Sequence, residues 1–169
     1  MKITKKTIIS CCIALLAIVA VCLMFTPFVK YSTGKTLIGE YTSTFNGFQL
    51  AFGHSVTNTL LGAKVTTKVL SASFGGIMTF IFFIAIAVLA CLNVFVKNSK
   101  LNMFFNIIIL VLAVVATVFC FCAPTGLMFL GADGKAIDNY GLGAGAIVDA
   151  ILMIVVACGA AVSQFVLKD

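Results

Sequence analysis

The sequence predicts an all-α membrane bundle of four transmembrane helices, with a small extracellular antiparallel β-sheet from the first outer loop. The 169 residues are 62% hydrophobic and 9% charged, whereas soluble domains are typically about 45–50% apolar and about 25% charged. Most of the surface must therefore face lipid. Four nearly uncharged stretches each reach the roughly 20 residues needed to cross a bilayer. The segment after the first stretch is rich in Thr, Val and Phe, which favour strands.

The four helices are predicted within a single domain, at about residues 8–26, 77–97, 102–123 and 144–167. A helix satisfies its own backbone polar groups in lipid, and the alternation typical of a barrel strand is absent. The first stretch follows Lys2, Lys5 and Lys6, as the apolar part of a signal peptide would. Its apolar run is too long for a signal peptide, and no small-residue cleavage site follows. We therefore interpret it as a retained helix.

Lysines in the short segments predict the orientation. Six lysines fall in short segments on one side of an even-numbered bundle, and the other five lie in the two outer loops; the six are Lys2, Lys5, Lys6, Lys97, Lys100 and Lys168. Because positive charge in short loops marks the cytoplasmic side, both termini are expected inside the cell, with the protein in the plasma membrane. The chain has no arginine and its lysines are scattered, so nucleic acid is not an expected partner. Abundant Lys, Ile and Phe without Arg or Trp suggest a bacterial origin.

The first outer loop, residues 27–75, is expected to form the sheet. Thr36–Phe45 and Phe48–Phe52 flank Asn46-Gly47, a strong short-range signal for a β-hairpin. In the second arm, large apolar residues alternate with Gln and Ala, which predicts one apolar face. The residues of that face are Phe45, Phe48, Leu50 and Phe52.

Two further segments carry strand signals. Ala63–Leu70 is predicted as a third strand. The short outer loop, residues 124–143, contains Asp133-Gly134 and is predicted to form a second, shorter hairpin. Because an isolated two-stranded hairpin is marginal in water, we expect a small sheet that rests on the helix ends.

This order of elements resembles the claudin-like tetraspan family, in which four helices with both ends inside carry a large β-rich first outer loop and a small second one. The resemblance is one of topology over most of the chain. The claudin signature of Trp, Gly-Leu-Trp and Cys-Cys is missing, since the chain has no Trp and this loop has no cysteine. Phe45–Gly53 also resembles a segment of small uncharacterised tetraspan proteins of Gram-positive bacteria. The claudin-like topology implies lateral self-assembly and contacts between cells, by analogy of fold alone.

Polar and small residues within the apolar segments are the other candidate sites. Asp149 is predicted either at the outer interface, near the start of its helix, or as part of an ion or proton pathway. Asn102 and Asn106 share a helix face, with Asn93 near the same inner end of the preceding helix, and we favour hydrogen bonding between helices over a pore mouth. Gly141 and Gly145, which we assign to the fourth helix and its start, form a Gly-xxx-Gly pair, which predicts close packing within the bundle or between subunits.

Residues that could act in catalysis are too few to predict an enzyme. The seven cysteines all fall in apolar segments, which argues against disulfides and favours small buried hydrophobes. One histidine, His54, and one glutamate, Glu40, offer neither a metal site nor paired carboxylates. No phosphate-binding loop, nucleophile elbow or zinc-protease motif is present, so no cofactor and no metal are expected.

These observations predict a non-enzymatic tetraspan that acts through protein–protein contacts of its outer β-layer. Its expected partners are the lipid bilayer and either further copies of itself or another membrane protein. Two alternatives remain at this point. The first is a subunit of an oligomeric channel, whose pore between subunits would be lined by Asp149, Asn102 or Asn106. The second is an accessory subunit of a transporter complex.

Overall fold

The computed structural model describes residues 5–36, 39–60, 63–70, 72–96, 98–123 and 140–166. The chain divides into two compact units. The helical unit comprises Met1–Leu23, Ile81–Cys120 and Val148–Asp169. The β-containing unit comprises Met24–Phe80 and Phe121–Ile147.

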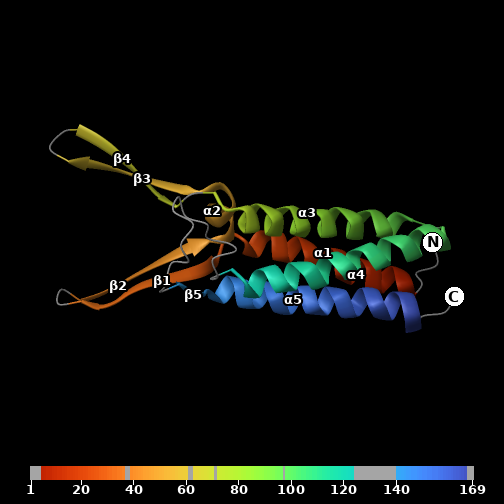
Figure 1. Cartoon of the computed structure of the whole chain (residues 1–169). Helices are drawn as coiled ribbons and strands as arrows, with labels where there is room; N and C mark the ends of the chain where they lie inside the picture. The colour runs from red at the N-terminus through yellow and green to blue at the C-terminus, as the bar shows by residue number, and fades with distance from the viewer. Residues whose placement is uncertain are drawn as a thin grey trace. The chain divides into compact units, whose positions relative to one another are not determined.

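Four long helices account for most of the described chain (Figure 1). They are α1 (Lys5–Leu23), α3 (Phe74–Phe95), α4 (Ser99–Phe121) and α5 (Ala144–Ala161), and α5 continues as the π-helical segment η1 (Val162–Val166). Each is long and apolar enough to cross a membrane. The prediction of four apolar helices is therefore confirmed. The first three helices begin slightly earlier than predicted. At the start of α4, the side chain of Asn98 accepts a hydrogen bond from the backbone N–H of Lys100 at 3.0 Å. This is a typical helix cap.

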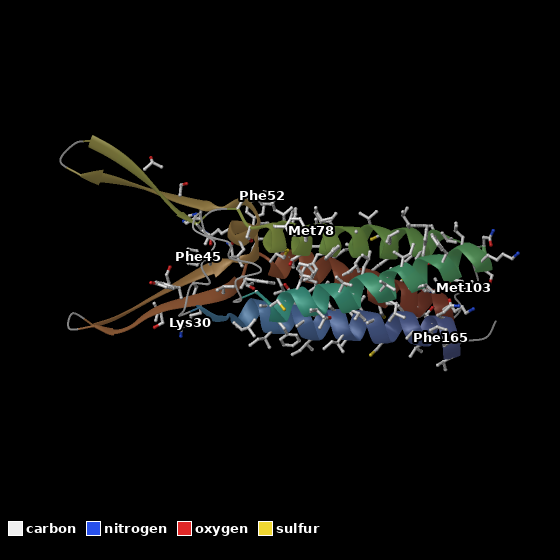
Figure 2. All side chains as sticks on the ribbon, viewed as in Figure 1. Lys30, Phe45, Phe52, Met78, Met103 and Phe165 are labelled. Carbon is white, nitrogen blue, oxygen red and sulfur yellow. The ribbon has the colours of Figure 1, made fainter. Side chains whose placement is uncertain are left out.

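Small residues make up much of the interior of the helical unit, together with a few large side chains such as Phe83 and Met153. Alanines recur on the buried faces of all four long helices: Ala17, Ala20, Ala90, Ala113, Ala116, Ala150 and Ala160. Many large apolar residues lie on the exposed faces, among them Met103 and Phe165, which are labelled in Figure 2. A soluble bundle would bury these large side chains. Small residues inside let helix backbones approach closely, which is the packing typical of helices in lipid.

Within the described residues of the β-containing unit, five strands form two antiparallel sheets. The first sheet has the order β2-β1-β5, with β1 at Pro27–Thr36, β2 at Gly39–Asn46 and β5 at Tyr140–Leu142. The second is a hairpin of β3 (His54–Leu60) and β4 (Ala63–Leu70). The predicted strand at 63–70 is confirmed, although it pairs with β3, a strand that the sequence analysis did not predict. The shorter hairpin predicted around Asp133-Gly134 lies outside the described residues.

The hairpin predicted at Asn46-Gly47 is wrong. Asn46 ends β2, and Gly47–Phe52 form a short helix, α2. The Asn46 side chain accepts a hydrogen bond from the backbone N–H of Gln49 at 2.7 Å, and the Gln49 side chain accepts one from the backbone N–H of Asn46 at 3.0 Å. This reciprocal pair is a capping box, so Asn46 acts as a helix cap rather than as a turn residue. The hairpin of this region is instead β1–β2.

Candidate functional site

The apolar face predicted from residues 45 to 52 is not a single face. Leu50 and Phe45 are buried, at 1% and 6% exposure, whereas Phe48 and Phe52 are 40% and 52% exposed. The reason is the period of α2, because residues four apart share a helix face while residues two apart do not. Phe45 and Phe52 are labelled in Figure 2. Of the four predicted contact residues, Phe48 and Phe52 are therefore the pair that is available to a partner.

Phe48 and Phe52 belong to an aromatic cluster with Phe25 and Phe80. The Phe48 ring stacks on Phe25 at 5.5 Å between centroids and meets Phe80 edge-on at 6.0 Å. Phe52 lies 4.7 Å from Phe48 and 5.3 Å from Phe80. Each such pair adds about 0.5–1.5 kcal/mol beyond the area it buries. The sequence analysis missed Phe25 and Phe80, because they are distant in sequence and belong to the ends of apolar stretches.

The two glycines of the Gly-xxx-Gly pair lie in different elements. Gly141 is in β5, opposite Lys30 of β1, so its predicted place on a helix is wrong. Gly145 is in the first turn of α5, and a Cβ built there would collide with the Thr26 side chain and approach the Pro27 carbonyl oxygen at 2.8 Å. The close approach at Gly145 therefore lies within one chain, and within the β-containing unit.

Asp149 is buried inside the fold, near the start of α5. Its side chain is 0% exposed and shares the buried face of α5 with Met153 and Val156. Neither carboxyl oxygen has a hydrogen-bond partner among the residues that the structure describes. Burying a carboxylate without a partner is costly. Within the same residues, no group of three or more His, Cys, Asp or Glu side chains is arranged to hold a metal ion.

Three asparagines form a closed ring of hydrogen bonds in the helical unit. Asn93 of α3 donates to Asn106 of α4 at 2.8 Å, Asn106 donates to Asn102 at 3.1 Å, and Asn102 donates back to Asn93 at 2.9 Å. Asn106 also donates to the hydroxyl oxygen of Ser163 in η1 at 3.4 Å. Asn93, Asn106 and Ser163 are buried. The ring therefore links α3, α4 and the end of α5, and Ser163 is the member that the sequence did not indicate.

The strand edges are the remaining candidate contact surface. Among the described strands, β2 pairs with β1 on one side only, and β3 and β4 pair only with each other. From Thr42 to Asn46, β2 contains neither a charged residue nor proline, whereas β4 carries Lys64 and Lys68. Lysine and proline are the residues that usually keep an edge strand from pairing with another chain. The β2 edge therefore lacks this protection.

In comparisons with protein-family models, with curated proteins and with solved structures, no match was found.

Proposed function

We propose that this chain is a non-enzymatic, multi-pass membrane protein that assembles with further copies of itself through the open edge of β2. Four helices of spanning length support the membrane part, and they bury many alanines while exposing many large apolar side chains. The lysines of the short segments support an orientation with both termini in the cytoplasm and the β-layer outside the plasma membrane.

The proposed assembly is supported by the edge of β2 that pairs with no other described strand. An extended edge gains affinity from main-chain hydrogen bonds to a second strand. Two copies of β2 related by a two-fold axis at Ser43 would pair antiparallel. Glu40 of one copy would then face Asn46 of the other, so the one charged residue of β2 would meet no like charge. Thr42 would face Thr44, and such threonine pairs stabilise neighbouring strands.

The test is to place lysines on that edge. In the double variant Thr42→Lys/Thr44→Lys, each new lysine faces another across the two-fold axis, and directly opposed like charges are destabilising. Both positions are exposed, as are Ser55 and Thr66 of the other hairpin, where Ser55→Lys/Thr66→Lys serves as the matched control. We expect the unchanged protein and the control to form assemblies in nanodiscs, and the β2 variant to be a monomer by particle mass. A β2 variant that stays assembled would refute pairing through β2.

An unchanged protein that is a monomer in nanodiscs would also refute self-assembly, and would favour the role of an accessory subunit beside a different membrane protein. The channel alternative has less support from the geometry. A pore between subunits needs its lining residues on the outer surface of the bundle. Asp149 and Asn106 are buried within the chain instead.

The natural cysteines test whether the helices cross a bilayer. Cys11, Cys12, Cys22 and Cys158 are exposed on the helix surfaces, contrary to the predicted burial of all seven, and none of the seven is in a disulfide. In intact vesicles, lipid should shield them from a charged, water-soluble thiol reagent. The same reagent should label them after the membrane is dissolved in SDS. Full labelling in intact vesicles would show that these helix faces lie in water.

A further inference from the structure

Helix α2 carries an apolar surface that no described residue of the β-containing unit covers completely. Its sequence, Gly47–Phe52, has no charged residue, and Phe48 and Phe52 leave much of their surface exposed. Phe25, their neighbour in the aromatic cluster, is also exposed. Burying a phenylalanine side chain fully is worth about 1.5–3 kcal/mol. Contiguous apolar patches of this kind usually mark a protein or membrane contact.

The contacts that α2 makes near the end of α1 and the start of α3 give the depth of α2 in the proposed membrane. The Phe48 ring contacts Phe25, two residues beyond the end of α1, and also Phe80, six residues after the start of α3. At about 1.5 Å per residue, Phe80 lies roughly 9 Å along α3 from its first residue. The 22 residues of α3 extend about 33 Å, close to the roughly 30 Å of a hydrocarbon core. The aromatic cluster is therefore level with the outermost turns of the membrane-spanning segment.

A glycine lets α2 lie directly against α3. A Cβ built on Gly76, in the first turn of α3, would be 2.6 Å from the carbonyl oxygen of Leu50. Real Cβ atoms do not approach that closely, so a side chain at this position would push α2 away. The close contact holds Phe48 and Phe52 at the depth given by Phe80.

The N-terminal backbone groups of α2 find partners within the protein. A short helix in water leaves its first N–H groups to solvent or to a cap. In α2, the backbone N–H groups of Asn46 and Gln49 bond to side-chain oxygens of the capping box. The backbone N–H of Phe48 donates to the carbonyl oxygen of Met24 at 3.2 Å.

Two carbonyl groups toward the C-terminal end of α2 also find partners within the protein. The carbonyl oxygen of Leu50 accepts hydrogen bonds from the backbone N–H of Ser73 at 3.2 Å and from its hydroxyl at 3.0 Å. The carbonyl oxygen of Gln49 accepts one from the backbone N–H of Gly53 at 2.8 Å. Internal partners for the ends of a helix are what a lipid environment requires, because lipid chains offer no hydrogen bonds.

We propose that α2 is embedded in the outer leaflet, with Phe48 and Phe52 in contact with lipid acyl chains. The proposal rests on the membrane-spanning part of the proposed function and is independent of the β2 contact. It assigns Phe48 and Phe52 to lipid instead of to the protein–protein interface predicted from the sequence. In this arrangement α2 fixes the depth at which the β-layer begins.

Fluorescence of single tryptophans tests this directly, because the chain contains no Trp of its own. Phe48→Trp and Phe52→Trp each place one reporter on α2, and the second guards against local misfolding in the first. Val88→Trp, on the exposed face of α3, is the control for a lipid-facing site, and Thr66→Trp, on exposed β4, is the control for water. Each variant is reconstituted into vesicles with lipids brominated near the head group or near the chain end, and is separately exposed to aqueous iodide.

We expect both α2 reporters to be quenched several-fold more by lipids brominated near the head group than by iodide. If iodide quenches them while brominated lipid quenches Val88→Trp, α2 lies in water and this inference fails, although the spanning helices stand. If neither quencher reaches them, a protein partner covers α2 and the inference also fails. If brominated lipid does not quench Val88→Trp, the membrane-spanning proposal itself fails.

Discussion

Asn106→Leu removes the member of the asparagine ring that makes the most hydrogen bonds. Its side chain accepts one bond from Asn93 and donates to both Asn102 and Ser163. Hydrogen bonds between helices in membranes average about 0.6 kcal/mol each. Two of the three lost bonds join different helices and the third, to Asn102, lies within α4; at this average the three together cost about 2 kcal/mol. Leucine is similar in size to asparagine, so the cavity contribution is small, and the main additional cost is the unpaired amide groups left behind.

Replacing all three asparagines at once tests whether they stabilise the protein together or independently. When Asn93, Asn102 and Asn106 are all leucine, no ring amide remains unpaired, and replacing every partner by apolar groups can be nearly neutral. We expect the triple variant to be more stable than Asn106→Leu alone. Ser163→Ala, which removes only the longest of the bonds, should cost the least. Reversible unfolding in mixed micelles with increasing SDS gives each free energy.

Additivity is the result that would refute this reasoning. If the triple variant lost the sum of the three single losses, the amides would act independently, and the ring would have no cooperative role. A double-mutant cycle between Asn93 and Asn106 measures the same coupling for one pair.

Other substitutions test individual features of the fold. Asp149→Leu should raise the free energy of unfolding by about 1–3 kcal/mol, because it removes a buried carboxyl group that has no partner among the described residues. A loss of stability in the SDS titration would instead show that the carboxyl binds a group at this site. Gly145→Ala should destabilise the chain by about 1–3 kcal/mol through collision with Thr26. Gly141→Ala, whose added Cβ would meet no atom nearer than 3.9 Å, is its control, and equal thermal stability of the two variants would contradict the packing argument. Asn46→Ala should cost about 1 kcal/mol by removing the cap of α2, which chemical denaturation would detect, whereas Asn46→Ser should be nearly neutral.

Much of the architecture follows from the sequence because it depends on local properties. Apolar length predicts the four long helices, and the Thr- and Val-rich run at Ala63–Leu70 predicts β4. The candidate site is harder to predict. Asn46-Gly47 is equally compatible with a turn and with a helix cap, and Gln49, three residues later, completes the capping box. Alternation from Phe48 to Phe52 fits a strand, but the same residues at positions four apart also give one face of a helix.

The sequence by itself determined that the chain has four apolar helices and a strand-forming segment between the first two. Hydropathy and strand propensity belong to single residues and add up along the chain, so no knowledge of distant partners is needed. Only the tertiary structure decided which side chains are buried and which meet. Asn106 bonds to Ser163, 57 positions away, and Asp149 is buried because of the face that α5 turns inward. Such contacts depend on how each helix is rotated about its axis and on its register with its neighbours, and many rotations are compatible with stretches that are apolar on every side.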